Sequence, residues 1–505
     1  MTEWFINKIL RVTELNDDEA RREILAEMSI KLQSLTRQDL KEISRNLNFS
    51  GLFSQLTSND RKSIEEICNI LKILMEGLEP GEVHRRYPSE LRLFIKHSES
   101  AARALALKEL EREAAGSPEI LEQLLHDGDL LRSTLERIGD EDLGVANLAM
   151  GIAKKIGSEI QGARILYSGE SLRTIAKLLA KNDATSFRVY EVVVAIAKNS
   201  EEGLEASANS GFLHGLINVL DNDDILLQLN ALEAMSDLAE SDHGLDYLQE
   251  QKVLKRLADK IARAGEDPLS GLFIPGLMKF FGSVARRRPD EIFSKYPVVI
   301  TSLFELIQAE DTSLLGNALD TLGHVASSVQ GKYALQMLGD SMPCALLKIS
   351  EIIRNSPNEL RLRGLENLAL ILHLDKQDQD NRTLTLTKSW FDRLADNPLG
   401  VVVTLSKQPF ADIRQSSLLI LATLSSQNWG QEYIANFPGL LEFLLDRGAE
   451  TFKNCKDLKY QIVKNLVDSD SEVFDPESLD KLKKFVLQGP YHVDQETEVT
   501  TEGAS

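Results

Sequence analysis

The sequence predicts an all-α fold, an armadillo/HEAT-like α-solenoid in which about ten helical repeats form a superhelix. Three observations favour this class. The chain has 505 residues, well beyond the roughly 250–300 residues at which a single hydrophobic core stops growing. It is rich in Leu, Ala, Glu and Lys and has only 6% aromatic residues, which disfavours a β-rich fold. A polar break also recurs along the chain at a nearly constant interval.

This break separates one apolar helical segment from a second and usually ends in an acidic residue. Successive breaks lie 40 to 53 residues apart, a period typical of HEAT and armadillo units. An acidic side chain at the break would cap the second helix by accepting hydrogen bonds from its first backbone amides. The break residues that set the register are Asp60, Ser100, Asp142, Asp183, Asp224, Asp267, Asp311, Glu359, Asp412 and Asp457.

The unit at residues 211–239 shows the pattern most clearly. The apolar residues of its first helix keep the i, i+3, i+4, i+7 spacing of one helical face, and they are Leu213, Leu216, Ile217 and Leu220. A two-helix unit of about 40 residues cannot bury such a stripe alone, so its neighbours must stack against it. We therefore expect a repeat array at 50–488, an N-terminal helical cap at 1–49 and a polar, acidic C-terminal tail at 489–505.

Two stretches fit the pattern less well. At residues 265–276, Pro268 and Pro275 should interrupt helices. At residues 389–406 the interval between breaks is longest. Both stretches are expected to hold longer loops or a kink.

The run Ile274–Gly282 contains two glycines, Gly276 and Gly282, which could mark a ligand-binding loop. Close packing of helices after a turn begun by proline explains them better. On that interpretation Phe280 and Phe281 belong to the core.

Charge and hydropathy exclude several classes of protein. The formal net charge of −21 would repel a phosphate backbone, so nucleic acid is not an expected partner. The start of the chain lacks the basic and apolar regions of a secretory signal, and no stretch approaches the roughly 18 uninterrupted apolar residues of a membrane span. We expect a soluble protein of the cytoplasm, with the nucleus as a further location.

The motifs of catalysis and metal binding are missing from the sequence. There is no phosphate-binding loop, no HExxH and no GxSxG, so we expect no catalytic residues, no metal site and no cofactor. Cys68, Cys344 and Cys455 lie far apart with no CxxC pair. They are expected to be small buried residues in a reducing compartment.

A polar stripe on the second helices is the most informative feature for function. It appears when the units are superposed on their break residues, and it keeps the spacing of one helical face. We call it the polar ladder, and its members are Arg188, Glu191, Asn230, Glu233, Asp237, Lys279, Asn317, Asp320, His324, Arg363 and Glu366. The second helices of such solenoids usually line the concave surface, so the ladder is a candidate protein-binding surface.

For any single member, an ordinary solvated helix face is the better explanation of the residue. The pattern as a whole carries the hypothesis. Four units have an acid at the equivalent position, namely Glu191, Glu233, Asp320 and Glu366, and one has Lys279. This favours a partner with a basic surface.

Specific strings extend the prediction to a family. The sequence resembles the 26S proteasome non-ATPase regulatory subunit 5 family over about residues 90–493, in the stretches Phe187–Glu191, Asp267–Gly282, Phe437–Gly439, Asp446–Arg447, Lys456–Tyr460 and Gly489–Val493. The resemblance implies a chaperone for assembly of the base of the regulatory particle, absent from the finished particle. The implied partners are the C-terminal domain of a base ATPase subunit and, in the same module, a second ATPase subunit and the largest non-ATPase base subunit.

Two other classes remain open. A generic armadillo scaffold or cargo adaptor shares every feature except these strings, although Trp4, Trp390 and Trp429 all lie off the ladder. Nuclear import adaptors, by contrast, line the groove with recurring Trp and Asn pairs. An enzyme assembled from distant residues is the third class, and an open groove suits it poorly.

Overall fold

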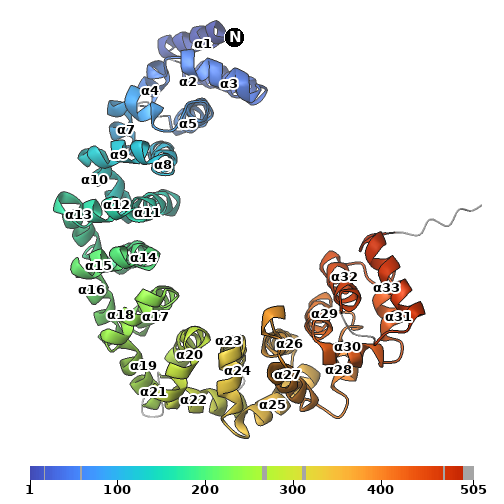
Figure 1. Ribbon diagram of the computed structural model, residues 1–505. Helices are drawn as coiled ribbons and strands as arrows, with labels where there is room; N and C mark the ends of the chain where they lie inside the picture. Colours follow the sequence, from blue (N-terminus) through green and yellow to red (C-terminus); the bar gives the residue numbers. More distant parts are fainter. Residues whose placement is uncertain (16, 57–59, 264–269, 310–313, 470–472, 493–505) are drawn as a thin grey trace, which may run out of the picture. The chain divides into compact units, whose positions relative to one another are not determined.

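The computed structural model describes residues 1–15, 17–56, 60–263, 270–309, 314–469 and 473–492. Within these ranges the chain consists of helices joined by short connections and contains no strand (Figure 1). The all-α prediction is confirmed. The chain divides into two compact units, Met1–Gln251 and Lys252–Ser505, and each is described by itself.

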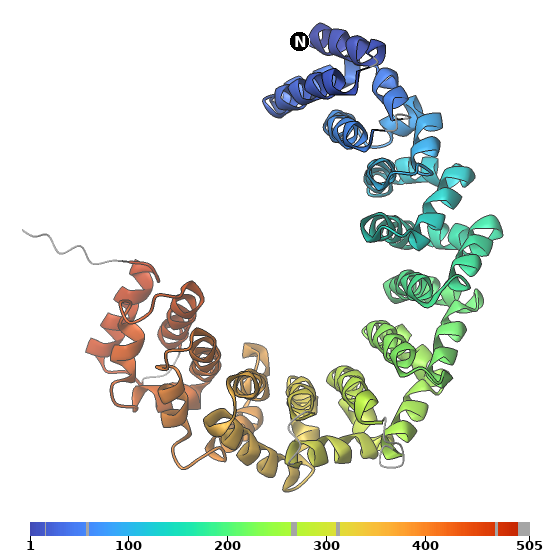
Figure 2. The same ribbon diagram turned by 180° about the vertical axis from the view of Figure 1, so that it is seen from behind.

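In each unit one helix of every repeat, generally the longest, lies beside its counterparts in a row that we call the long-helix row. The remaining helices form a second row, the short-helix row (Figures 1 and 2). In the first unit the long-helix row is α2 (Asp18–Gln33), α5 (Arg61–Glu76), α8 (Ser100–Ala114), α11 (Leu143–Gly157), α14 (Asp183–Asn199) and α17 (Ile225–Leu238). In the second unit it is α20 (Ser270–Arg287), α23 (Leu315–Ala326), α26 (Asn358–Leu372), α29 (Ala411–Ser425) and α32 (Lys453–Val467). Each helix in a row packs against the next one in the same unit.

The short-helix row supplies the rest of each unit. In the first unit its members are α1 (Thr2–Glu14), α3 (Arg37–Asn46), α4 (Ser50–Gln55), α6 (Glu82–Arg86), α7 (Pro88–Phe94), α9 (Pro118–His126), α10 (Gly128–Glu136), α12 (Ile160–Leu166), α13 (Gly169–Leu179), α15 (Glu201–Asn209), α16 (Phe212–Asn218) and α18 (Asp242–Glu250). In the second they are α19 (Val253–Ala262), α21 (Pro289–Lys295), α22 (Pro297–Gln308), α24 (Val329–Gln336), α25 (Ser341–Asn355), α27 (Asn381–Asp392), α28 (Pro398–Leu405), α30 (Asn428–Ala435), α31 (Leu440–Leu445) and α33 (Pro476–Gln488). Three short 3₁₀ turns complete the set: η1 (Arg137–Gly139), η2 (Val219–Asp221) and η3 (Lys376–Asp378).

The repeat register is right, but the number of helices per repeat is not two. Two helices of the short-helix row precede most long helices, as α12 and α13 precede α14. The unit of about 40 residues therefore has three helices. The segment between two long helices, which the apolar pattern predicted to be one helix, forms two short helices.

The acidic breaks act as helix caps in the earlier repeats. Asp142 accepts a hydrogen bond from the backbone N–H of Val145 at 3.0 Å, and Asp60 and Asp224 cap α5 and α17 in the same way. For α14 the capping side chain is Asn182, one residue before the predicted Asp183. The later break residues Glu359, Asp412 and Asp457 lie inside their helices, and Asp267 and Asp311 lie outside the described residues.

In five repeats a glycine marks the point at which the chain leaves a long helix and begins the next short one. A Cβ on Gly162 would lie 2.0 Å from the carbonyl oxygen of Ile156, and one on Gly331 would lie 1.9 Å from that of Val325. Only glycine allows the short helix to approach the end of the long helix so closely. The equivalent glycines are Gly162, Gly203, Gly244, Gly331 and Gly430.

Several local expectations are corrected. Pro275 does not interrupt a helix, because it lies inside the continuous α20, and Pro268 lies outside the described residues. Residues 389–406 hold the end of α27 and all of α28, so the longer interval is largely helical. Cys344 is exposed at the start of α25, while the other two cysteines are buried.

The close-packing interpretation of Gly282 is supported. A Cβ there would lie 2.9 Å from Cγ2 of Thr321 on α23. The adjacent Phe280 and Phe281 are fully buried. The glycine therefore allows α20 and α23 to pack closely.

Candidate functional site: the polar ladder of the long-helix row

The ladder residues fall into two groups, one in each compact unit. In the first unit they lie on α14 and α17, and in the second on α20, α23 and α26. The helical spacing that predicted the ladder does bring its members together within each unit, as the following contacts show. Whether the ladder binds a partner stays a prediction.

Arg188 has a structural role within the first unit. Its guanidinium donates hydrogen bonds to the backbone carbonyls of Ile138 at 3.1 Å and Asp140 at 2.9 Å. These carbonyls belong to the turn before α11, so Arg188 ties α14 to the preceding repeat. The Arg188 guanidinium is therefore already hydrogen-bonded to the preceding repeat.

Acidic side chains gather between α14 and α17. Lys154 of α11 donates to Glu191 at 2.6 Å, and Lys198 of α14 pairs with Glu240, which lies just after α17. Partial burial and neighbouring carboxylates raise the pKa of Asp237. Those carboxylates belong to Glu240, Glu233 and Glu191.

The two lysines neutralise only part of this cluster. Asn230 and Glu233 are exposed on the same helix. The face of α14 and α17 thus presents carboxylates to solvent, held near one another by the stacking of the two helices. Such a surface attracts a basic partner.

A hydrogen-bonded network joins α23 to α26 in the second unit. Arg363 Nη1 donates to Asn317 Oδ1 at 3.3 Å and to Asp320 Oδ2 at 3.2 Å. Asn367 Nδ2 donates to Asp320 Oδ1 at 2.6 Å. These contacts hold the Asp320 carboxylate in place. Its observed role is to link α23 to α26.

Two glycines of α23 make room for this network. A Cβ on Gly316 would lie 2.7 Å from Nη1 of Arg363, and one on Gly323 would lie 2.1 Å from Oδ1 of Asn367. Sequence reasoning missed both Asn367 and the glycines. Gly316 and Gly323 are seven residues apart on one helical face, and that spacing was the available signal.

The remaining ladder residues of the second unit surround this network. Burial lowers the pKa of His324, and the cations of Arg286 and Lys279 on α20 act in the same direction. Burial and the carboxylate of Asp320 raise the pKa of Glu366. Lys279 and Glu366 are exposed, so they are available to a partner.

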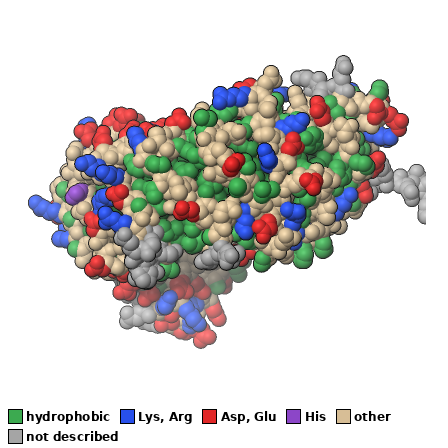
Figure 3. All heavy atoms as spheres, turned by 90° about the horizontal axis from the view of Figure 1, so that it is seen from below, with side chains coloured by type: hydrophobic (Ala, Val, Ile, Leu, Met, Phe, Trp, Pro, Cys, Tyr) green, Lys and Arg blue, Asp and Glu red, His purple; other side chains and the backbone are tan. Residues whose placement is uncertain are grey.

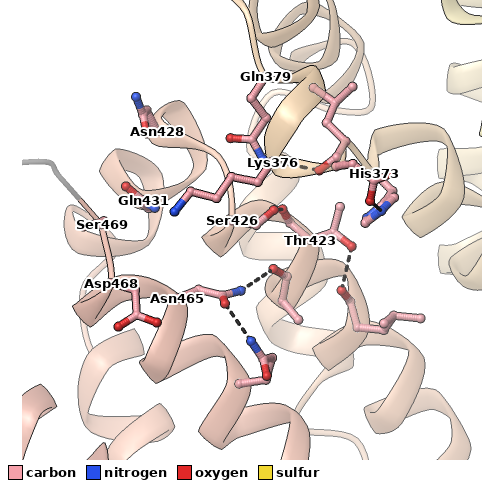
Figure 4. Close-up of a pocket in the computed structure, with 15 residues that line it drawn as sticks. His373, Lys376, Gln379, Thr423, Ser426, Asn428, Gln431, Asn465, Asp468 and Ser469 are labelled. Carbon is pink, nitrogen blue, oxygen red and sulfur yellow. Dashed lines mark hydrogen bonds and ion pairs between the residues drawn. The ribbon is translucent and has the colours of Figure 1, made fainter. Parts of the chain in front are cut away.

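A polar cleft in the second unit was not predicted. It has a volume of 470 Å³ and is lined by residues from the α26–α27 connection, α29, α30 and α32. Figure 4 shows its side chains. The signal for it was a set of amide residues at helical spacing, such as Gln461 and Asn465 on α32.

The described residues contain neither a metal-binding cluster nor a membrane-spanning helix. Among the described residues no cluster of His, Cys, Asp and Glu could hold a metal ion, and none of the helices in those ranges is long and apolar enough to cross a membrane. On the face drawn in Figure 3, hydrophobic side chains reach the surface between charged groups of both signs.

Comparison with solved structures supports the fold. Two crystal structures of importin beta align with TM-scores of 0.61 and 0.63, each at 12% sequence identity and over 95% of this chain. The alignments cover 67% and 59% of those chains, respectively. At this identity the likeness concerns the helical solenoid fold alone.

Comparison with known sequences extends over nearly the whole chain. A family model described as the proteasome non-ATPase 26S subunit matches residues 1–505. A Homo sapiens protein named 26S proteasome non-ATPase regulatory subunit 5 is 31% identical over 489 residues, which is 96% of this chain and 97% of that protein. A Drosophila melanogaster protein of the same name is 30% identical over 443 residues, covering 87% of this chain and 85% of that protein.

These matches confirm the resemblance first seen in short strings. They also extend it to the N-terminal part of the chain, where the strings were weakest. The chain belongs to the family of proteasome non-ATPase 26S subunits.

Proposed function

We propose that this chain is an assembly chaperone of the 26S proteasome, which binds ATPase subunits of the regulatory-particle base and leaves before the particle matures. The observation that carries the proposal is the match to regulatory subunit 5 over almost the full length of both chains. The proposed contact is the C-terminal domain of a base ATPase subunit, in a module that also holds a second ATPase subunit and the largest non-ATPase base subunit. In this proposal the chain acts in the cytoplasm, by binding these subunits and not by catalysing a reaction.

The exposed carboxylates of the ladder support a partner with a basic surface. Glu233 in the first unit and Glu366 in the second are both exposed on long helices. Charges at such a rim steer a partner into place and change the rate of association more than the final affinity. The contribution of each should therefore weaken as salt concentration rises.

A pull-down with charge-reversed variants tests this surface. The test variant is Glu233→Lys combined with Glu366→Lys, because neither side chain belongs to the Arg363 network that Asp320→Lys would break. The control is Glu205→Lys combined with Glu305→Lys, which changes two exposed glutamates on the short-helix row. Circular dichroism checks that both proteins are folded.

Because these charges act mainly on association, the expected result is at least a tenfold loss of base ATPase subunits captured by the test variant in a short incubation at low salt, with the control unchanged. Equal capture by both folded variants would show that the ladder is not the contact surface. Capture of no base subunit by the wild-type chain would overturn the proposed function itself.

A further inference from the structure

Side-chain amides line the polar cleft of the second unit. They come from the α26–α27 connection, from α30 and from α32, and they are Gln379, Asn428, Gln431, Gln461 and Asn465. The cleft volume of 470 Å³ falls within the roughly 300–1,000 Å³ typical of ligand clefts. We call this site the amide cleft.

Hydrogen bonds hold several of these amides in fixed orientations. Gln431 Nε2 donates to the carbonyl of Ser425 at 2.9 Å. Asn465 Nδ2 donates to Ser425 Oγ at 2.9 Å. Figure 4 shows two further bonds of this side chain: Asn465 Nδ2 donates to the carbonyl of Ala422 at 3.2 Å, and Gln461 Nε2 donates to Asn465 Oδ1 at 2.7 Å. Because the orientations are set before a ligand arrives, binding costs little side-chain entropy.

Other polar groups in the cleft have no partner. Within the described part of the chain, the side chains of Lys376, Asn428 and Asp468 take part in no hydrogen bond or ion pair. Lys376 lies in the α26–α27 connection and Asp468 directly follows α32, and Figure 4 draws both among the side chains that line the cleft. The cleft therefore offers unused donors and acceptors beside amides that are already held in fixed orientations.

The lining chemistry selects among ligand classes. Its charged side chains are one cation, Lys376, and two carboxylates, Asp375 and Asp468. The one histidine, His373, has its Nε2 3.3 Å from a carboxylate oxygen of Asp375. A phosphate group would therefore meet little net positive charge. No Phe, Tyr or Trp lines it, so it offers none of their rings as a platform for a base or a sugar. An amide both donates and accepts, which matches the alternating N–H and C=O groups of a polypeptide main chain.

The spacing of the helices fits an extended peptide. The long helices α26, α29 and α32 pack consecutively, and packed helices lie roughly 8–10 Å apart. An extended chain rises about 3.3 Å per residue. Every third residue of such a segment would therefore meet the next helix.

We propose that the amide cleft binds an extended segment of a partner polypeptide across α29 and α32, chiefly through the main chain of that segment. Main-chain recognition gives affinity with loose sequence preference. The inference goes beyond the proposed function, since it requires no proteasome subunit and depends on different residues from the polar ladder.

The probe is a library of random dodecapeptides displayed on phage and selected on the full chain. A selected peptide is then measured against Gln461→Leu combined with Asn428→Leu, two exposed amides of the cleft. The control is Gln308→Leu, the same chemical change at an exposed position on α22. The expected result is at least a tenfold loss of affinity in the double variant and none in the control.

The mode of binding is read from the peptide itself. N-methylation of single main-chain amides should abolish binding at the positions that meet a helix, about every third residue, whereas alanine replacement of each side chain should change affinity less than threefold. Selection of no peptide that responds to the double variant would overturn the inference. Alanine-sensitive anchors at i, i+3, i+4 and i+7 would overturn it as well, because they would show that a helix docks there.

Discussion

Replacing Gly162 by alanine tests how the repeats are closed. Gly162 lies in α12, directly after the long helix α11. An alanine Cβ there would lie 2.0 Å from the carbonyl oxygen and 2.8 Å from the carbonyl carbon of Ile156. Both are backbone atoms at the end of a helix, so neither can move aside as a flexible side chain could.

The magnitude follows from two opposing effects. Forcing an extra carbon into a well-packed site costs about 1–3 kcal/mol, and the contact with rigid backbone puts this site at the upper end. Alanine in place of a helical glycine returns about 0.5–1 kcal/mol of backbone entropy. The net expectation is a loss of roughly 2 kcal/mol in the free energy of unfolding.

Gly128 supplies the matched control in the same unit. It is the first residue of α10 in the short-helix row, and a Cβ built there meets no atom within 4 Å. Urea unfolding followed by circular dichroism should rank Gly162→Ala below the wild type and Gly128→Ala at or slightly above it. A Gly162→Ala protein as stable as the wild type would refute the claim that close approach requires this glycine.

Two further predictions concern buried charges. Burial opposes protonation of His84, but hydrogen bonds and charge from Glu113 and Asp127 outweigh it and raise the pKa of His84. The stabilisation by His84 should therefore be complete below the unfolded value near 6.5 and be lost as pH rises through the folded value. The difference in unfolding free energy between the wild type and His84→Gln should be larger at pH 5.5 than at pH 8, and a pH-independent difference would contradict this. Arg414 donates to both carboxylate oxygens of the buried Glu450 at 3.0 and 3.1 Å. Glu450→Ala should therefore cost about 3 kcal/mol, because it leaves the positive charge of Arg414 without its carboxylate and with only the carbonyls of Gln408 and Pro409 as partners. Urea midpoints should show no such loss in Glu442→Ala, an exposed site in α31, and equal stability of the two variants would rule out the paired role.

The register of the repeats was predictable because its signals are local. The cap at Asp142 and the apolar stripe at Leu213 to Leu220 depend on spacings within one or two helical turns. The polar ladder was predictable for the same reason. These patterns repeat, so each unit supports the interpretation of the next.

The third helix of each unit was harder to predict. The segments α12 and α15 are only 7 and 9 residues long, too short to show a clear apolar period. The glycines that close the repeats were nonetheless visible, since Ser200 precedes Gly203 and Ser328 precedes Gly331 at the same spacing. In each case the serine Oγ accepts a hydrogen bond from the glycine N–H at 3.0 Å.

The partners of the ladder residues depend on distant parts of the chain. Arg188 bonds to carbonyls about 50 residues away, and Arg363 bonds to Asp320 in the preceding repeat. A helical-wheel argument shows that these residues share a face, but it does not show which of them bond to one another. Only the packed structure separates those that hold the stack together from those that face solvent.

Native co-purification of the full chain from cells of its source tests the central claim most directly. The account predicts that base ATPase subunits and the largest non-ATPase base subunit co-purify with it in near-equal amounts, without subunits of the proteolytic core particle. Recovery of the chain as a stoichiometric part of the complete 26S particle, or with diverse cargo and no base subunit, would contradict the account.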